Sequence, residues 1–287
     1  MKYKSGLILS MLIFGTIGVL RRNIGLGSAA LAMLRGYIGG ACLIIYMLLR
    51  GSRPYFAVLK RNIWKLLISG AFIGLNWMML FEAYNHTSVA TATLCYYMAP
   101  VIVMLLSPVV LKERLTKKQL ICALAAVAGM VPVSGVLSVD GFAASEIKGV
   151  LLGLAAAALY GCVILMNKRI TDVSAMDRTV VQLFAAAMVV TPYVFAAEGF
   201  SFAEIAGRDL IFVLTAGIIH TGAAYAMYFG SMTRLPARTV ALLSYIDPVF
   251  AVVLSATVLG EVMSPIGWVG AAVVLGAMAV SELPEKK

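Results

Sequence analysis

Ionisable side chains inside apolar segments are the residues of this sequence most suited to chemistry. Asp247 precedes Pro248 near the middle of ALLSYIDPVFAVVLSATVLGE, residues 241–261. A charge at the centre of a bilayer costs about 2.5–3.5 kcal/mol on insertion scales, so such a residue should face the protein interior and either pair or take up a proton. Three roles are open for Asp247: proton carrier, counter-ion to a cationic substrate group, and neutral acid that donates a hydrogen bond.

His220 and Arg35 also lie inside apolar segments. A lone histidine in an apolar helix is more often a hydrogen-bonded packing residue, but His220 lies at a depth similar to that of Asp247, and histidine titrates near neutral pH. Arg35 could receive a substrate carboxylate or pair with Glu82. We favour the pairing, although the two roles are not exclusive.

Polar and aromatic side chains at comparable depth complete a candidate binding site. Aromatic residues at the ends of membrane spans usually anchor at the lipid interface. Three tyrosines, Tyr96, Tyr97 and Tyr245, are too central for that role. We expect the site to be lined by some of a set of eight residues: Asn76, Trp77, Tyr96, Tyr97, Tyr225, Tyr228, Ser244 and Tyr245.

Two prolines interrupt the segments that hold these tyrosines. Pro100 and Pro248 each remove a helix hydrogen bond and leave a carbonyl four residues earlier without its usual donor. Lipid cannot satisfy such a carbonyl, so these turns should face protein or a water-filled cavity. The prolines are interpreted either as hinges or as static kinks. Glu113 and Glu261, which end the same segments, are interpreted as structural charges, solvated or paired with a neighbouring helix.

The composition is typical of a membrane protein. Hydrophobic residues make up 62% of the 287 residues and charged residues only 13%, and the mean hydropathy is +0.96. The net charge of +10 falls in short clusters between apolar runs, whereas a nucleic-acid interface needs a continuous basic face. No nucleotide-binding or hydrolase motif is present. The four cysteines stand alone inside apolar runs and are interpreted as small apolar residues: Cys42, Cys95, Cys122 and Cys162. Because these motifs are absent and the cysteines are not paired, we expect no cofactor, no metal and no enzymatic activity.

Ten apolar runs are long enough to cross a bilayer, which takes about 20 residues. They fall at about 5–22, 29–49, 64–84, 88–111, 118–137, 147–166, 176–197, 209–232, 237–259 and 264–283. Lysine and arginine favour the cytoplasmic side. Of the 23 such residues, all but five lie at the termini or in even-numbered loops, so both termini are predicted to be cytoplasmic; the exceptions are Arg21, Arg22, Arg35, Lys148 and Arg208. The predicted fold class is an all-α membrane protein with ten transmembrane helices.

An internal repeat relates the two halves of the sequence. Residues 88–116 align without a gap to residues 236–264, and between 89 and 113 ten of 25 positions are identical. Phe14-Gly15 likewise resembles Tyr160-Gly161. We predict two five-helix repeats, 1–146 and 147–287. Five spans per repeat place the copies in opposite orientations, an arrangement that lets a central site open alternately to either side.

The pattern from Ala92 to Glu113, repeated from Val240 to Glu261, resembles the EamA family of the drug/metabolite transporter superfamily, and the resemblance covers nearly the whole chain. It implies a ten-span fold and a transport activity, with substrates that range from amino acids to sugars and drugs. Asp247 aligns with Ala99 of the first repeat, so no role shared by both repeats can be assigned to it.

We therefore expect a secondary transporter of the cytoplasmic membrane that moves an amino acid-like or drug-like metabolite. Export is the commoner direction in the family, and proton or exchange coupling through Asp247 is a hypothesis. A flippase for a lipid-linked sugar or another amphipathic substrate is the alternative, and a membrane-embedded enzyme a weaker one. The expected partners are a small-molecule substrate and the lipid bilayer, with a homodimer left open.

Overall fold

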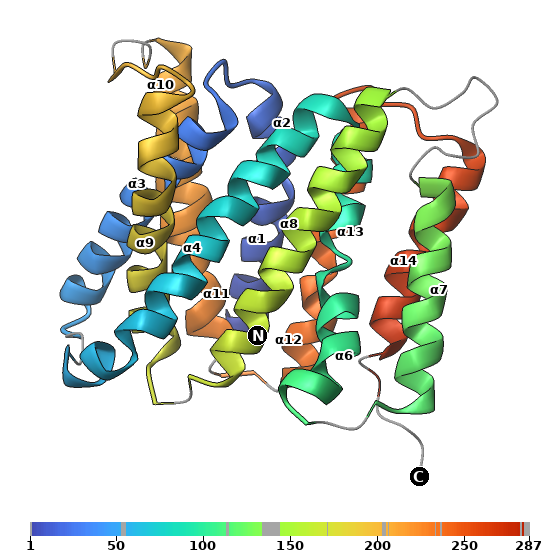
Figure 1. Cartoon of the computed structure of the whole chain (residues 1–287), viewed down its shortest axis with the longest axis horizontal. Helices are drawn as coiled ribbons and strands as arrows, with labels where there is room; N and C mark the ends of the chain where they lie inside the picture. The colour runs from blue at the N-terminus through green and yellow to red at the C-terminus, as the bar shows by residue number, and fades with distance from the viewer. Residues whose placement is uncertain are drawn as a thin grey trace.

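The computed structural model describes residues 2–52, 56–112, 115–133, 144–170, 172–202, 205, 207–232, 234–235, 237–281 and 283. Regular secondary structure in this part of the chain is helical (Figure 1). The elements are α1 (Lys2–Gly15), α2 (Ile17–Arg22), α3 (Ser28–Leu49), α4 (Phe56–His86), α5 (Val89–Tyr96), α6 (Ala99–Val110), α7 (Lys117–Val133), α8 (Ala144–Lys168), α9 (Ala175–Ala196), α10 (Arg208–Leu214), the π-helix η2 (Thr215–Ala223), α11 (Ala224–Met232), α12 (Ala237–Ser244), α13 (Ile246–Thr257) and α14 (Pro265–Ser281).

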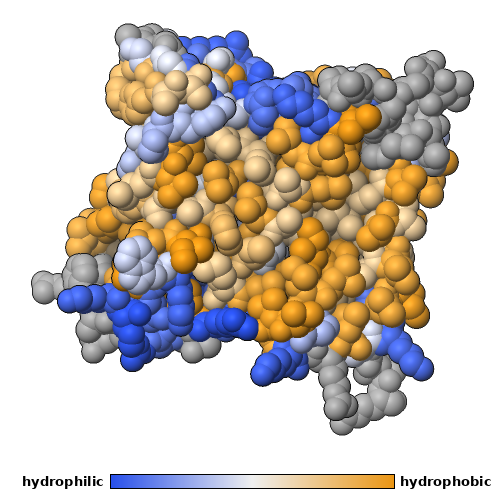
Figure 2. All heavy atoms as spheres, viewed as in Figure 1, coloured by the Kyte–Doolittle hydropathy of each residue, from blue (hydrophilic) through white to orange (hydrophobic). Residues whose placement is uncertain are grey.

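The structure confirms an all-helical protein with helices suited to a membrane. Within the described residues, seven helical stretches are long and apolar enough to cross a bilayer, and two shorter apolar helices, α13 and α14, accompany them. Hydrophobic side chains form a broad band across the face shown in Figure 2, with hydrophilic groups at both ends. The count of ten spans and the cytoplasmic location of the termini stay predictions.

Among the breaks between consecutive helices, two lie at aligned positions of the repeats. One break lies at Tyr97 and Met98, between α5 and α6, and the other at Tyr245, between α12 and α13. Tyr97 has φ −72° and ψ 2°, and Tyr245 has φ −71° and ψ −9°. Residues that align in the two repeats therefore share a backbone conformation, as the repeat predicts.

The two prolines lie shortly after these breaks. Pro100 is the second residue of α6 and Pro248 the third residue of α13. In the first turn of a helix the missing N–H costs little, because that group has no partner within the helix. Each proline thus lies in the first turn of a new helix, and its interpretation as a hinge or as a static kink stays a prediction.

The helix pairs α5–α6 and α12–α13 are antiparallel, with the start of α5 beside the end of α13. The Val89 N–H, at the start of α5, donates to the Glu261 carboxylate just beyond α13 at 2.7 Å. The Ala90 N–H donates to Ser255 Oγ at 3.3 Å. This arrangement agrees with inverted repeats. The predicted boundary after residue 146 falls in the first turn of α8, and it stays a prediction.

Small residues let α4 and α9 approach closely, as in many membrane helix pairs. A Cβ at Gly74 would lie 2.4 Å from the Ala186 carbonyl oxygen, and one at Gly70 would lie 2.7 Å from the Gln182 carbonyl oxygen. Backbone atoms cannot move aside as a flexible side chain can. The α4–α9 contact therefore requires glycine at these positions.

We expect Gly74→Ala to lower the melting temperature of the purified protein. The added methyl overpacks a backbone contact, and such overpacking typically costs about 1–3 kcal/mol. Gly276→Ala is the matched control, because nothing lies within 4 Å of its Cβ position in α14. There alanine should be neutral or stabilising by up to about 1 kcal/mol. Equal melting temperatures for the two variants would contradict the close packing of α4 and α9.

Candidate functional site

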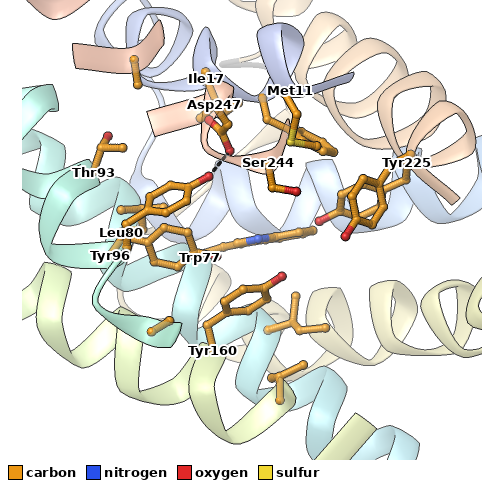
Figure 3. A pocket seen from close by; sticks show the side chains of 18 of the residues that line it. Met11, Ile17, Trp77, Leu80, Thr93, Tyr96, Tyr160, Tyr225, Ser244 and Asp247 are labelled. Atoms are coloured by element: carbon orange, nitrogen blue, oxygen red, sulfur yellow. Dashed lines mark hydrogen bonds between the residues drawn. The ribbon is translucent and has the colours of Figure 1, made fainter. Parts of the chain in front are cut away.

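A cavity of about 410 Å³ lies between the two breaks. Figure 3 shows Trp77, Tyr160, Tyr225, Ser244 and Asp247 around one space, with a dashed line from Asp247 to the hydroxyl of Tyr97. Aromatic side chains dominate the wall: Phe14, Trp77, Tyr84, Tyr96, Tyr97, Tyr160, Tyr225, Tyr228 and Phe229. A largely apolar wall with a few polar groups is the usual character of a small-molecule site.

The two breaks place Asp247 and Tyr97 against each other. Asp247 lies in the first turn of α13, and its carboxylate accepts a hydrogen bond from the hydroxyl of Tyr97, at the end of α5. Ser244 lies one turn before Asp247, lines the same cavity, and donates to the Val240 carbonyl at 2.8 Å. Asp247 is thus half-buried and paired with a residue from the other repeat, as expected of a carboxyl at this depth.

Arg35 forms part of the opposite wall and is only 6% exposed. Its Nε–H donates to Thr221 Oγ1 at 2.7 Å, and its Cζ lies 4.2 Å from the ring centroid of Trp77, a cation–π distance. Among the residues that the structure describes, no carboxylate lies within ion-pair distance of Arg35.

The predicted pairing of Arg35 with Glu82 is therefore wrong in this structure. Glu82 accepts from Ser28 Oγ at 2.8 Å, Asn85 Nδ2 at 2.9 Å and His86 Nε2 at 3.1 Å. Arg35 is seven residues further along α3 than Ser28, about 10 Å at 1.5 Å per residue. The carboxylate and the guanidinium consequently lie at different depths.

His220 belongs to the π-helix η2 and is 4% exposed. Its Nε2 lies 2.8 Å from Thr16 Oγ1, and its Nδ1 lies 3.2 Å from the Thr215 carbonyl oxygen. Both ring nitrogens thus have partners, and His220 is absent from the described residues that line the cavity. These contacts favour a packing role over a binding role.

Asn76 ties two helices together. It is fully buried, and its Nδ2 donates to the Ala156 carbonyl of α8 at 2.5 Å. Together with Tyr245 and Pro248 it is absent from the described lining. The other predicted residues lie on the cavity wall: Arg35, Trp77, Tyr96, Tyr97, Pro100, Tyr225, Tyr228, Ser244 and Asp247. Glu113 lies outside the described residues.

A polar group at the α8–α9 end of the cavity was not predicted from the sequence. Gln182 Nε2 donates to Ser69 Oγ at 2.6 Å and to Asn167 Oδ1 at 2.8 Å. Arg178 Nη1 donates to the Asn167 carbonyl at 3.2 Å. In the sequence Arg178 looks like a loop charge, but it lies in the first turns of α9 and lines the cavity.

Tyr160 was not predicted as a site residue either, although the internal repeat could have indicated it. It aligns with Phe14, and both side chains line the cavity.

The opposite end of the cavity lies beside α2 and the start of α5. Gly18 of α2 lines the cavity here, and its Cβ position is 2.3 Å from Val89 Cγ1. A group of hydrogen-bonded residues lies beyond this contact, and we call it the Glu261 cluster. Glu261 accepts from Arg22 Nη2 at 2.8 Å, from the Val89 N–H at 2.7 Å and from the Ser255 hydroxyl. Arg22 also donates to the Thr87 carbonyl at 2.9 Å. The cluster, defined by these residues, joins α2, α5 and the end of α13.

Comparison with known proteins identifies a family whose sequence model matches this chain. The sequence model of the EamA-like transporter family matches this chain twice, over residues 2–135 and 147–282. The uncharacterized transporter YxxF of Bacillus subtilis is 28% identical, over 88% of this chain and 81% of its own length. An uncharacterized transporter of Archaeoglobus fulgidus is 23% identical, over 98% and 97% of the two chains. A crystal structure with a TM-score of 0.69 and 23% identity, covering 97% of this chain and 95% of its own, has the same fold.

Proposed function

This chain belongs to the EamA-like transporter family, and we propose that it moves a small organic metabolite across the cytoplasmic membrane by alternating access. Membership of the family makes it a multi-pass membrane transporter. One observation carries the finer proposal. Hydrogen bonds of the Glu261 cluster join helices beyond one end of the cavity, and the lining reaches Asn167 and Arg178, at the ends of α8 and α9, at the other. A site that reaches toward one side and is sealed from the other is one state of an alternating-access cycle.

Equivalent positions of the two repeats pack differently, as such a cycle requires. A Cβ at Gly15 would lie 2.9 Å from the Asp247 carbonyl oxygen, whereas a Cβ at Gly161 would lie 3.6 Å from the Ala99 carbonyl oxygen. Gly161 aligns with Gly15, and Ala99 aligns with Asp247. In the opposite state, Gly161 would pack tightly against the Ala99 carbonyl, and Gly15 would lie further from the Asp247 carbonyl.

Two serines that align in the repeats, Ser255 and Ser107, have different hydrogen-bond acceptors among the described residues. Ser255 donates to Glu261. Its counterpart Ser107 donates to the Met104 carbonyl of its own helix at 3.1 Å.

The predicted orientation places the α8–α9 end in the cytoplasm, because the loops on that side carry most of the lysine and arginine. The state described here would then be inward-facing. A cavity loaded from the cytoplasm suits export, which we propose as the direction of transport.

Accessibility of a cysteine placed in the cavity tests this proposal. In a variant without the four native cysteines, Ser244→Cys should react with a membrane-impermeant maleimide mainly from the cytoplasmic side, as measured in inside-out and right-side-out vesicles. Met188→Cys is the control: this side chain is 60% exposed in the middle of the apolar helix α9, where we expect lipid, and it should react from neither side. Equal labelling of Ser244→Cys from both sides would contradict a closed end.

Asp247 is the proposed coupling residue. We expect Asp247→Asn to insert normally and to abolish the pH dependence of transport by reconstituted vesicles, because the amide cannot bind or release a proton. Retained pH dependence in this variant would exclude Asp247 from coupling. Glu82→Gln is the control, since Glu82 lies outside the cavity lining and should keep the wild-type pH profile.

A further inference from the structure

We infer that the cavity takes small organic anions, in which a carboxylate binds the Arg35 guanidinium and an apolar, ring-bearing body packs among the aromatic side chains. This inference rests on the proposed function and adds the chemical class of the substrate. It depends on three features of the cavity: the free edge of Arg35, the balance of charge on the wall, and the state of Asp247.

Most of the N–H donors of Arg35 make no hydrogen bond within the described part of the chain. A guanidinium carries five N–H donors in a planar fork. Only Nε–H is used in a hydrogen bond within the described part of the chain, on Thr221, while Trp77 covers one face. The Nη edge is therefore the part of this cavity residue left for a ligand. A buried cation without an acidic partner is costly, and a carboxylate that binds two N–H groups in parallel would compensate it.

Positive charge predominates on the cavity wall. The described lining includes two arginines, Arg35 and Arg178, and one carboxyl group, Asp247. The net charge of these three side chains is +1 when Asp247 is ionised and +2 when it is protonated. A cavity with apolar walls concentrates the field of such charges and attracts ligands of opposite sign. Arg178, at the α8–α9 end, is placed to draw an anion inward, and Arg35, at the deep end, is placed to hold it.

Asp247 is less suited to bind a cation. Its carboxylate already accepts a hydrogen bond from Tyr97, a residue of the opposite repeat. A cationic ligand at Asp247 would also have to lie in a cavity whose other two charges repel it. The hydrogen-bonded carboxyl and the two arginines together favour an anion over an amine.

The walls define the rest of the ligand. Rings of Trp77, Tyr96, Tyr97, Tyr160 and Tyr225 surround the space, and a volume of about 410 Å³ is enough for a molecule with one or two rings. Aromatic side chains bury apolar area and favour edge-to-face or offset contacts with a ligand ring. A simple probe of this class is 3-phenylpropionate. Its uncharged counterpart of similar size is 3-phenylpropanamide.

Equilibrium binding to the purified protein in detergent tests the inference. Replacing Trp64 and Trp268, which are 75% and 42% exposed, by Phe leaves Trp77 beneath Arg35 as the fluorescent reporter. We expect 3-phenylpropionate to quench this fluorescence and to bind at least about tenfold more tightly than 3-phenylpropanamide. 3-Phenylpropylamine should bind more weakly than either.

Variants of the two cavity arginines test which residue causes the preference for the acid over the amide. Arg35→Gln should bind the acid and the amide equally, whereas Arg35→Lys should keep a reduced preference for the acid. Arg178→Gln should weaken acid binding by a smaller, salt-dependent factor. Arg208→Gln is the control, because Arg208 lies over Phe212 outside the cavity lining and should leave binding unchanged.

Three outcomes would overturn the inference: equal affinity for the acid and the amide, tighter binding of the amine, and absence of acid binding at millimolar concentration. The acid–amide comparison retains native Arg35, so a misfolded Arg35 variant does not affect it. Vesicle uptake of the same probes separates this inference from the proposed function. Acid binding without transport would contradict the transport proposal alone, and transport of the amine without acid binding would contradict only the anion proposal.

Discussion

Replacing Glu261 by Gln is expected to open the closed end of the cavity. Three donors converge on this carboxylate: Arg22 Nη2 on Oε1, and the Val89 N–H and the Ser255 hydroxyl on Oε2. A glutamine of the same shape presents an N–H₂ group to at least one of these donors. The closed state therefore loses hydrogen bonds and gains a donor–donor contact.

The effect should be large. A hydrogen bond to a charged group contributes about 1.5–3 kcal/mol, and 1.4 kcal/mol is a factor of ten in an equilibrium constant. Arg22 is 34% exposed, so solvent screens its share, and most of the loss comes from Val89 and Ser255. In the Ser244→Cys background, we expect Glu261→Gln to raise maleimide labelling from the closed side by about tenfold or more.

Glu198→Gln provides a matched control at the same end of the molecule. The Glu198 carboxylate accepts from the N–H groups of Ala29 and Ala30, at 3.1 and 2.9 Å, and so caps α3. This contact resembles that of Glu261 with α5, but it joins the segment after α9 to the start of α3 and involves neither of the two breaks. The control should reduce stability without changing the labelling. An increase of the same size in both variants, or in neither, would show that the Glu261 cluster does not keep the cavity closed.

Alanine at Gly15 and at Gly161 should have different effects although the two positions are equivalent in sequence. At Gly15 the methyl would lie 2.9 Å from the Asp247 carbonyl oxygen, a contact that forces a backbone shift. Overpacking of this kind costs about 1–3 kcal/mol. At Gly161 the nearest atoms are 3.4 and 3.6 Å away, in ordinary van der Waals contact.

We therefore expect Gly15→Ala to lower the melting temperature and to increase labelling of Ser244→Cys from the closed side. Gly161→Ala should leave both unchanged, because the present state accommodates the methyl. In exchange of 3-phenylpropionate by reconstituted vesicles, both variants should be slowed severalfold, since Gly161 would take the tight position in the opposite state. Wild-type exchange by Gly161→Ala would contradict a cycle in which the two contacts alternate.

Much of the architecture follows from the linear order of residues. Long apolar runs with few charges predict membrane helices, because lipid excludes unpaired polar groups and leaves the helix as the simplest way to satisfy the backbone. The repeated Tyr-x-x-Pro pattern indicates where two spans are interrupted, and both breaks are found there. Depth along a span can be counted directly, so Trp77, Tyr97 and Asp247 are correctly placed at the level of the cavity.

The direction in which each side chain points cannot be read in the same way. A membrane helix is apolar on its lipid face as well as on its buried face, so amphipathicity does not distinguish the two. Asn76 and His220 lie at suitable depths, yet they bond to neighbouring helices away from the cavity lining. The wrong pairing of Arg35 with Glu82 has a similar cause, because which polar groups meet depends on how the helices pack.

The composition and the repeat alone are enough to predict a helical membrane protein built from two related halves, with a buried acid beside one of two matching breaks. The packed helices decide which side chains meet at each end of the cavity and which arginine has no acidic partner among the described residues. The physical reason is that two similar sequence halves describe a nearly symmetric molecule. The contacts of Glu261 with Arg22 and Val89 hold α2 and α5 against the end of α13, and we propose that they favour one of the two asymmetric arrangements.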